Sequence, residues 1–414
     1  MRIRTIGALI LMGLASACAR APEPGARTTS AFAQSTQGSQ DPQALSQAAE
    51  RPKAEPLRVA LLAPVGVDAD AKPGASDGLG LMLERSARLA MRDMAAPFEL
   101  DVIDTGTGTP GIIDAAQRAV DGGAKLVVGP IYASDVAAAS SVTLPAGVPM
   151  LAFTSDTSRA AGGIYTNAFT PESDVRSILR HAGSLGTRHV VVFAPQGRYG
   201  DLVLATARDA IGRAGGQIAF AVRTDGSPES YRAAAHSAAI AVEGADAIYI
   251  PEGGRAPRAI MGELAGAGVR LAGKRVLGSG QWTSADLKDA RLDGALFAAN
   301  DESAFRTFAY RYEAVHAKKP TALGALAYDA VAIAVALTRR SPGTPWTRAA
   351  IESGAGFKGA TGLFRFRSDG TIERRLAIRE VRDGKSEQVK AADAAFGGTR
   401  TVMNGAGALA ALRR

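Results

Sequence analysis

The sequence predicts an α/β protein of two lobes, each built on a parallel sheet flanked by helices, with a cleft between the lobes. Short apolar runs alternate with amphipathic segments of helical length, which is the pattern of βαβ units. Two such series of similar length follow each other along the 414 residues, and 46% of the residues are hydrophobic, enough for two cores. Small and hydroxyl residues follow several apolar runs, at the strand ends where open α/β sheets bind ligands.

The amino terminus has the three regions of an export signal. Met1–Arg4 is positively charged, Ile6–Leu14 is apolar but too short to remain as a transmembrane helix, and small residues directly precede Cys18. This arrangement is typical of a bacterial lipobox, so we expect residues 1–17 to be a lipoprotein signal peptide and Cys18 to carry the lipid. An ordinary signal with an incidental cysteine is the alternative. Ala19 favours sorting to the outer membrane of a Gram-negative host, facing the periplasm.

Cys18 is the single cysteine of the chain, so the fold needs no internal disulfide. Residues 18–56 contain almost no large apolar side chain, which predicts a disordered tether with a reach of roughly 35 Å. Removal of Arg2 and Arg4 with the signal leaves 46 of the 48 Lys and Arg against 40 Asp and Glu, a formal charge of +6. These charges are scattered and not interleaved with aromatic residues, which argues against a nucleic-acid surface.

The first α/β series begins at Leu57. Its predicted strands are Leu57–Ala63, Phe98–Ile103, Lys125–Val128 and Met150–Ala152, and its predicted helices are Leu79–Met94, Gly111–Asp121 and Ser134–Leu144. The loop Gly66–Gly78 is long enough to be a functional flap.

The second series begins after Pro171. Its predicted helices are Glu172–Leu185, Asp201–Ala214, Ser230–Val242 and Arg255–Ala267, and its predicted strands are His189–Phe193, Gln217–Val222, Ala245–Ile250 and Arg275–Leu277. The segment Leu296–Asn300 and the helices Ser303–Ala317 and Leu323–Arg339 are interpreted as a return to the first lobe. Gly362–Phe366 and Arg375–Val381, separated by the turn Ser368–Gly370, predict a hairpin.

These elements divide the chain into two discontinuous lobes. Lobe 1 is expected to comprise residues 57–168 and 294–342, and lobe 2 residues 169–293 and 343–385. Residues 386–414 form an Ala- and Gly-rich tail.

Residues Gly106–Gly111 match the G-x-G-x-x-G spacing of a dinucleotide-binding turn. Two features argue against such a site. Val128, at the end of the next strand, leads into Gly129-Pro130 and not into the expected acid, and Pro110 removes one backbone N–H from the turn. We interpret the segment as a tight turn with proline at a helix start, and we expect no cofactor.

Metal-dependent or nucleophilic catalysis is not indicated either. The histidines lie on predicted helices or at a strand start, and none is paired by spacing with a second metal ligand; they are His181, His189, His236 and His316. No nucleophile–base pair is visible, although a triad assembled in three dimensions stays open. The sequence therefore favours a non-catalytic protein without a metal.

Polar and aromatic residues at the predicted strand ends are candidates for a ligand site. Hydroxyls and helix-start amides suit a carboxylate, acids suit an ammonium, and aromatic rings suit an apolar group. The candidates are Tyr132, Ser134, Thr154, Ser155, Asp156, Tyr199, Glu252, Gln281 and Trp282. Each has a structural alternative, because Ser134 and Asp156 could be helix N-caps, and Tyr132 and Trp282 could be packing residues.

Motifs in a fixed order carry a family resemblance over roughly residues 57–384. They are Val128-Gly129-Pro130, Val148-Pro149, Thr154–Asp156, Tyr199-Gly200, Ala327–Val331, Gly359–Gly362, Phe364–Phe366 and Asp369-Gly370. In this order they resemble the type I periplasmic-binding fold of leucine/isoleucine/valine-binding proteins. Within that fold, Phe153–Asp156 and the lipobox-like start are most similar to the lipoproteins called penicillin-binding-protein activators.

This resemblance implies a non-catalytic outer-membrane lipoprotein that activates a penicillin-binding protein, a peptidoglycan synthase, through protein contact. In amino-acid-binding relatives, the loop at Gly278–Gln281 supplies a carboxylate for the ligand's ammonium, and this sequence has none there. The missing charge would weaken ammonium binding by about 2 kcal/mol, unless Glu252 or Asp156 replaces it. The alternative is a periplasmic solute-binding protein that delivers a branched-chain-type amino acid or an amide to an ABC transporter.

Overall fold

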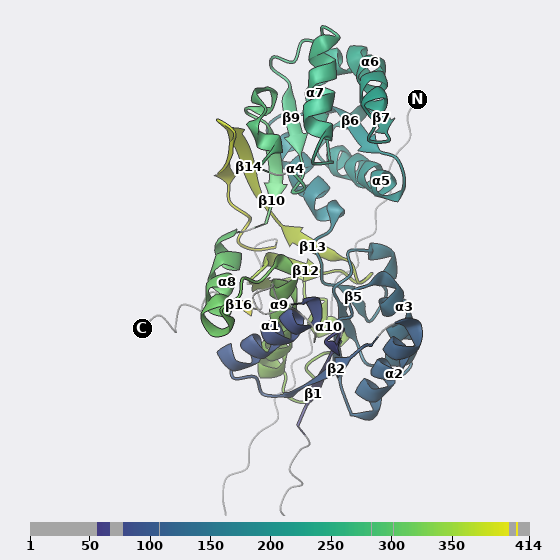
Figure 1. Ribbon diagram of the computed structural model, residues 1–414, viewed down its shortest axis with the longest axis vertical. Coiled ribbons are helices and arrows are strands. Elements are labelled where there is room, and N and C mark those ends of the chain that lie inside the picture. The colour runs from purple at the N-terminus through teal and green to yellow at the C-terminus, as the bar shows by residue number, and fades with distance from the viewer. Residues whose placement is uncertain are drawn as a thin grey trace, which may run out of the picture. The chain divides into compact units, whose positions relative to one another are not determined.

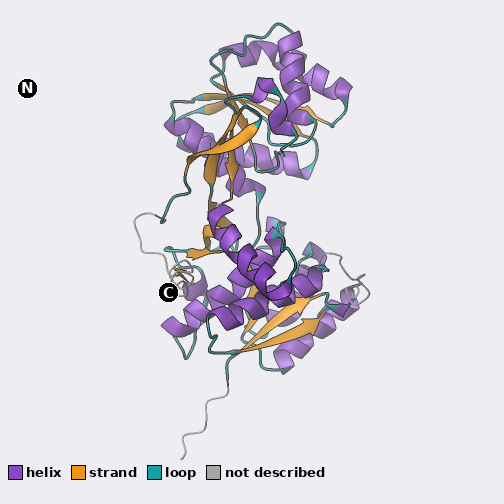
Figure 2. Cartoon of the chain, turned by 60° about the vertical axis from the view of Figure 1, so that its left-hand side comes forward, coloured by secondary structure: helices purple, strands orange, loops and turns teal. Residues whose placement is uncertain are grey.

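The computed structural model describes residues 56–66, 78–106, 108–282, 284–300, 302–396 and 403–404 (Figure 1). These residues form three sheets. The predicted signal peptide, Cys18, nearly all of the predicted tether and most of the predicted flap lie outside the described residues. Figure 2 shows the strands of the two larger sheets lying between helices.

The first sheet is parallel and has the strand order β2-β1-β3-β4-β5. Its strands are β1 (Arg58–Ala63), β2 (Glu99–Asp104), β3 (Leu126–Val128), β4 (Met150–Ala152) and β5 (Ile164–Thr166), with helices α1 (Leu79–Asp93), α2 (Gly108–Asp121) and α3 (Ala133–Thr143). Successive side chains of a strand point to opposite faces, so Val59 and Leu61 pack with α1, whereas Ala60 and Leu62 pack with α2 and α3. The predicted elements of the first series are thus present, and only the three-residue strand β5 was not predicted.

The second sheet is mixed and has the strand order β15-β14-β10-β9-β8-β6-β7. Its strands are β6 (His189–Pro195), β7 (Gln217–Thr224), β8 (Ala247–Tyr249), β9 (Arg275–Gly278), β10 (Leu296–Ala299), β14 (Ala377–Arg382) and β15 (Lys385–Lys390), with helices α4 (Pro171–Ser184), α5 (Arg198–Arg213), α6 (Pro228–Gly244) and α7 (Ala256–Gly266). Val190 and Val192 pack with α4 and α5, whereas Val191 and Phe193 pack with α6 and α7. Strand β14 pairs antiparallel with β10 and with the edge strand β15, so this sheet is parallel only in part.

A third, smaller sheet packs in the core of the first lobe. It has the order β13-β12-β11-β16, formed by β11 (Phe357–Gly359), β12 (Gly362–Phe366), β13 (Ile372–Arg375) and β16 (Met403–Asn404). The helices α8 (Glu302–His316), α9 (Ala322–Arg340) and α10 (Arg348–Ile351) precede it. Among the described residues, α9 is the one helix long and apolar enough to cross a membrane, but 78% of its apolar window is buried within the protein, as in a core helix.

Three of the predicted placements were wrong. Residues 343–375 were expected in lobe 2, but α10 and the small sheet belong to the first lobe, where Ile351, Phe357 and Phe364 pack in its core. The segment at Leu296 does not return to the first lobe, because Leu296 and Phe297 of β10 pair with β9 in the second sheet; the return begins at α8. The hairpin is formed by β12 and β13, with Phe366 opposite Ile372, whereas β14 crosses to the second sheet and pairs with β10. Short apolar strands resemble one another in sequence, so their partners depend on tertiary packing.

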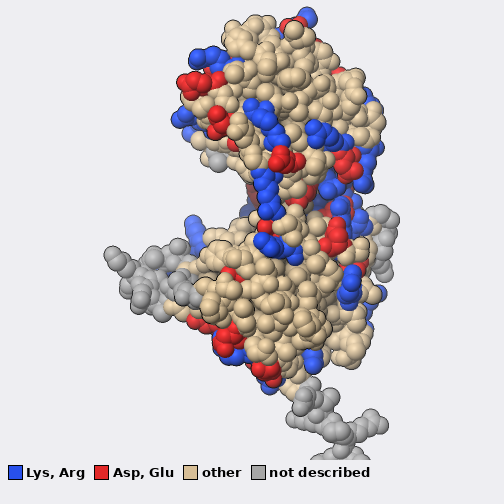
Figure 3. All heavy atoms as spheres, turned by 90° about the vertical axis from the view of Figure 1, so that its right-hand side faces the viewer, with Lys and Arg blue, Asp and Glu red and all other residues tan. Residues whose placement is uncertain are grey.

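The chain therefore crosses between the two lobes three times, after β5, after β10 and after β13. On the face drawn in Figure 3, charges of both signs are scattered over both lobes, and Lys and Arg atoms gather where the lobes meet.

Candidate functional site

A cavity of about 740 Å³ opens between the loop that follows β4 and the start of α5. It is lined by Ser155, Asp156, Thr157, Ser158, Pro171, Arg198, Tyr199, Asp201, Leu202 and Ala205. The first four lining residues follow a strand of the first lobe, and the residues from 198 onward belong to the second lobe. Three sequence candidates, Ser155, Asp156 and Tyr199, thus meet in one inter-lobe cleft.

Hydrogen bonds fix the first wall of the cleft locally. Asp156 Oδ1 accepts from the backbone N–H of Ser158 at 3.1 Å and from its hydroxyl at 2.7 Å, so Asp156 caps the short 3₁₀ turn Thr157–Arg159. Thr154 is buried, and its Oγ1 accepts from the N–H of Asp156 at 3.1 Å. Thr154 therefore positions this loop, and Ser155 is the candidate whose side chain has no such local role.

An ion pair joins the two walls, because Arg198 Nη2 lies 2.7 Å from Asp156 Oδ1. The hydrogen bond from Ser158 lowers the pKa of Asp156 below its ordinary value, and the charge of Arg198 lowers it further. Asp156 is consequently ionised and already paired. It is a poor replacement for the acid that an ammonium ligand needs.

Tyr199 lies at the start of α5 and links two loops of the second wall. Its hydroxyl donates to Pro251 O at 3.2 Å and accepts from Gln281 Nε2 at 3.0 Å. The next residue is Gly200, where an added Cβ would collide with the carbonyl oxygen of Pro195. Glycine is needed there because α5 starts against the end of β6, and this close approach brings Tyr199 and Gln281 together.

Two acids near Tyr199 have no cation partner among the residues that the structure describes. Glu252 Oε2 accepts from Thr224 Oγ1 at 3.2 Å, and burial raises the pKa of Glu252. Asp174, in the first turn of α4, accepts from the backbone N–H of Gly280 at 3.1 Å, and burial raises the pKa of Asp174 to about 7. Glu252 follows Pro251, which accepts from the Tyr199 hydroxyl, and Asp174 is bonded to Gly280, next to Gln281, so both acids lie near Tyr199. Burial raises the pKa of Tyr199 as well, and the charges of Asp174 and Glu252 raise it further. Of these residues, only Tyr199 lines the cavity; Asp174, Glu252 and Gln281 lie behind it.

Asp174 is the functional candidate that the sequence analysis missed. The loop Gly278–Gln281 contains no acid, but α4 brings the Asp174 carboxylate to the backbone of that loop. In the sequence, an acid in the first turn of a helix after Thr170-Pro171 is explained by its favourable interaction with the helix dipole, so it does not indicate a ligand site. Nearby, the buried Tyr249 hydroxyl has no hydrogen-bond partner among the described residues, so one unused hydrogen-bonding group lies at the base of this wall.

The other candidates have structural roles or lie elsewhere. Trp282 is 6% exposed, packs on Phe297 and donates its Nε1–H to Glu252 O at 3.0 Å, so it supports the wall from inside the core. Tyr132 is 55% exposed, and Ser134 Oγ donates to Asp135 at 3.1 Å. Neither Tyr132 nor Ser134 lines the cavity.

The described residues contain no cluster of three or more His, Cys, Asp or Glu suited to a metal. The glycine turn Gly106–Gly111 joins β2 to α2, which begins at Gly108. Asp104, at the end of β2, accepts hydrogen bonds from the N–H groups of Gly66 and Gly106, both at 3.2 Å.

Comparison with known proteins places the chain by sequence and by fold. The family described as periplasmic binding protein matches residues 56–386. Three solved structures illustrate the fold similarity. A protein described as a branched-chain amino acid ABC transporter from Rhodospirillum rubrum is 19% identical with a TM-score of 0.66, and the match covers 81% of this chain and 100% of that chain.

The second is an ABC transporter substrate-binding protein from Desulfitobacterium hafniense in complex with Leu. It is 17% identical with a TM-score of 0.55, and the match covers 80% of this chain and 99% of that chain. The third is a solute-binding protein from R. palustris in complex with benzoate. It is 17% identical with a TM-score of 0.50, and the match covers 83% of this chain and 99% of that chain. At these identities the likeness concerns the fold alone. No curated protein matches the sequence.

Proposed function

Because the chain belongs to the periplasmic binding protein family, we propose that it is a non-catalytic solute-binding protein that delivers a small zwitterion, an amino acid or a related amide, to an ABC transporter. The observation that supports this ligand class is the pair of carboxyl groups without a cation, Asp174 and Glu252, beside Tyr199. Acids that have lost water and gained no counter-charge bind a cationic group favourably.

The residues that line the cavity suit the other parts of such a ligand. The Ser155 hydroxyl and the N–H groups of Arg198 other than those of Nη2, which pairs with Asp156, are available to a carboxylate, while Leu202 and Ala205 offer an apolar wall. A volume of about 740 Å³ is within the usual range of small-molecule sites. The ligand would contact both lobes at once, so its binding would favour a closed arrangement.

The ligands printed for two similar structures, Leu and benzoate, belong to those proteins. They support a small ligand with a carboxylate here. They do not distinguish a zwitterion from a simple carboxylate, and the acids of this chain bear on that distinction. Asp174 and Glu252 favour the zwitterion, because a ligand without a cation would leave both of them uncompensated.

Thermal unfolding in the presence of single amino acids and amides tests the proposal. A ligand at a hundred times its Kd stabilises the folded protein by about 2.7 kcal/mol, which is readily seen as a rise in Tm. Benzoate serves as the matched ligand without an ammonium. Unchanged melting across the amino-acid panel, or a response to benzoate alone, would contradict the zwitterion proposal.

A second candidate function is that of a lipoprotein that activates a penicillin-binding protein. The lipobox-like residues before Cys18 support anchoring, with Ala19 favouring the outer membrane. The Asp156–Arg198 pair also joins the two walls of the cleft through the protein's own side chains. Such a link is expected in a protein that acts through its surface and does not need to capture a ligand. Co-purification with a peptidoglycan synthase and faster glycan polymerisation are the expected results. Tight amino-acid binding without synthase binding would exclude this candidate.

A further inference from the structure

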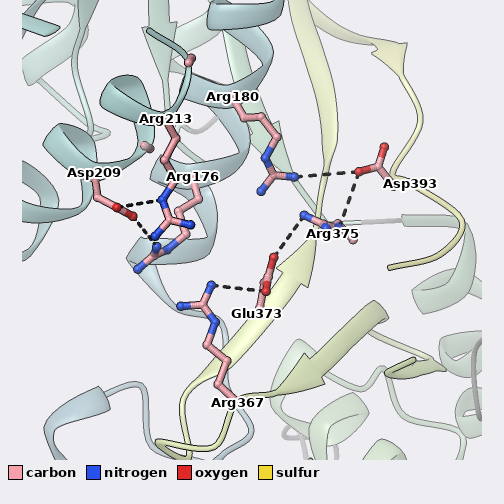
Figure 4. A pocket seen from close by; sticks show the side chains of 10 residues that line it. Arg176, Arg180, Asp209, Arg213, Arg367, Glu373, Arg375 and Asp393 are labelled. Atoms are coloured by element: carbon pink, nitrogen blue, oxygen red, sulfur yellow. Dashed lines mark hydrogen bonds and ion pairs between the residues drawn. The ribbon is translucent and has the colours of Figure 1, made fainter. Parts of the chain in front are cut away.

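A second pocket, of about 520 Å³, lies apart from the cleft and shares no lining residue with it (Figure 4). It is lined by Arg176, Arg180, Asp209, Ala210, Arg213, Ala214, Arg367, Glu373, Arg375 and Asp393, and we call it the arginine pocket. The residues come from α4 and α5 of the second lobe, from the β12–β13 turn and β13 of the small sheet, and from the segment after β15. Residues far apart in the sequence thus surround one space.

The arginine pocket is cationic. Five guanidinium groups line it against three carboxylates, which leaves a formal excess of two positive charges among the lining residues. Each carboxylate is shared between at least two arginines. Asp209 lies 3.0 Å from Arg176 and 2.9 Å from Arg213, and Glu373 lies 3.2 Å from Arg375 and 3.3 Å from Arg367.

Arginines on opposite sides of the pocket consequently repel each other. Burial lowers the pKa of Arg176, and the charge of Arg367, from the opposite side, lowers it further. Burial also lowers the pKa of Arg375, followed by the charge of Arg180. Arg176 and Arg367 share no carboxylate, because Arg176 pairs with Asp209 and Arg367 with Glu373. Arg180 and Arg375 share only Asp393, at 3.9 and 3.7 Å, so one carboxylate faces two cations.

The excess positive charge is partly buried, so it differs from an ordinary charged surface in water. The side chain of Arg375 is 15% exposed and that of Arg176 is 25% exposed. Arg375 Nε has no hydrogen-bond partner among the described residues, and Asp393 is 3.7 Å away. The planar guanidinium fork matches tetrahedral oxyanions bidentately, and a phosphate group near pH 7 carries a charge of about −2, which would neutralise the excess.

We propose that the arginine pocket binds a phosphate-type oxyanion with two or more negative charges, held between α4 and the β12–β13 turn. The volume exceeds that of one phosphate group, so the occupant is a pyrophosphate or a phosphate ester with room for its organic part. Because the two sides belong to different lobes, the anion would also link α4 to the small sheet.

Isothermal titration of the full chain with inorganic phosphate and with pyrophosphate tests this, in chloride buffers of matched ionic strength. The double variant Arg180→Gln with Arg367→Gln is the informative one. Among the described residues, Arg180 forms an ion pair only with Asp393, at 3.9 Å, and Asp393 keeps Arg375 and Lys390 when Arg180 is lost. Glu373 likewise keeps Arg365 and Arg375 after Arg367 is lost, so the carboxylates stay paired. We expect the Kd of pyrophosphate to rise about tenfold or more in this variant.

Arg306→Gln is the matched control, because Arg306 is 72% exposed on α8 and contacts only Glu302, at 3.9 Å. It should bind pyrophosphate as the unmodified chain does. If the double variant fails to fold by circular dichroism, the single variant Arg213→Gln, at a side chain 76% exposed, replaces it. Equal weakening in Arg306→Gln, or no heat of binding for either anion together with no binding to vesicles that contain phosphatidic acid, would overturn the proposal.

Vesicles of phosphatidylcholine with and without phosphatidic acid separate two sources of the phosphate. Binding of free pyrophosphate supports a soluble ligand, and co-sedimentation only with vesicles that contain phosphatidic acid, lost in the double variant, supports a lipid headgroup. Absence of both, like co-sedimentation that the double variant retains, counts against the arginine pocket as an oxyanion site.

Discussion

At the scale of single residues, the proposed ligand site depends on two buried carboxyl groups near Tyr199 that have no cation partner among the described residues. Burial raises the pKa of both Asp174 and Glu252, whereas Asp156, which has Arg198 beside it, has a lowered pKa. The three acids are chemically alike, so only their surroundings separate them. Asp156 has a structural role in this arrangement, and the other two retain capacity for a ligand.

Asp174 should make the stability of the protein fall as pH rises. Its pKa is raised from 3.8 to about 7 on folding, so the folded state binds more protons than the unfolded state between these values. The free energy of unfolding contributed by this group is therefore present below about pH 4 and is lost as pH rises through 7. Asp174→Asn keeps an acceptor for Gly280 N–H and should stabilise the protein at pH 8 by about 1–2 kcal/mol.

Urea denaturation at pH 4.5 and pH 8 measures this difference between the variant and the unmodified chain. The exposed residue Asp121, at the end of α2, provides the control variant Asp121→Asn, for which no such pH-dependent difference is expected. A variant equally stable relative to the unmodified chain at both pH values would show that Asp174 is ionised throughout.

Glu252 should contribute to ligand affinity more than to stability. Glu252→Gln keeps an acceptor for Thr224 Oγ1 but removes the charge, so we expect a zwitterionic ligand to bind about 10- to 100-fold more weakly. Titration calorimetry with the best amino acid from the thermal screen measures the change. Glu229→Gln, at an exposed position on α6, is the control and should bind normally. Unchanged affinity in Glu252→Gln would move the ammonium site away from this residue.

At the scale of elements, a buried polar network holds the first and third crossings together. The guanidinium of Arg374, 2% exposed, donates from Nε to Ala168 O at 2.7 Å and from Nη1 to Thr361 Oγ1 at 2.8 Å. Asp329 of α9 accepts from Thr361 N at 2.9 Å and from Ala360 N at 2.6 Å. Residues 167–168 follow β5, and Arg374 belongs to β13, so one guanidinium fixes two of the three connections between the lobes.

Arg374→Ala should therefore destabilise the protein strongly. It leaves the acceptors of the first crossing unpaired and takes a positive charge away from Asp329, whose pKa burial already raises to about 6. We expect a loss of about 3–5 kcal/mol in the free energy of unfolding, measured by urea denaturation at pH 7.

The control for this prediction is Arg382→Ala, at a side chain 52% exposed that pairs with Glu380 and Glu387. An exposed pair of this kind is worth less than about 1 kcal/mol. Should Arg374→Ala prove no more harmful than Arg382→Ala, the crossings must be held by the surrounding aromatic packing and not by the network.

At the scale of the whole molecule, the periplasmic binding protein family and the two-lobe fold agree, whereas attachment to a membrane rests on the amino-terminal sequence. The lipobox-like segment precedes the domain by a tether predicted to reach roughly 35 Å. That length would let an anchored domain work away from the membrane surface. Attachment is compatible with either proposed function.

Replacement of the proposed lipidated residue tests the anchor. Cys18→Ser should move the protein from the membrane fraction to the soluble periplasmic fraction, because a signal without its cysteine cannot receive the lipid. Cell fractionation and labelling with a radioactive fatty acid measure the change. Ser16→Thr, within the same segment, should be labelled normally. Equal membrane association of Cys18→Ser and the unmodified chain would show that Cys18 is not the anchor.

The sequence by itself determined the order of strands and helices, the division into two α/β lobes and the loops at Ser155 and Tyr199 that line the cleft. These features follow from periodicity and from turn residues, which act over a few neighbouring positions. The same patterns indicated Trp282 as a ligand contact, because an aromatic residue after a strand has the same sequence signature in a site and in a core.

Only the tertiary structure decided which sheet receives β10 and β14, how Asp174 reaches Gly280, and how Arg176, Arg367 and Asp393 come to surround one pocket. Asp174 and Gly280 are 106 residues apart in the sequence, and no local pattern connects them. Strand pairing and the burial of acids depend on which surfaces fit together after the chain has crossed between its lobes. The charge of the cleft is set by this packing.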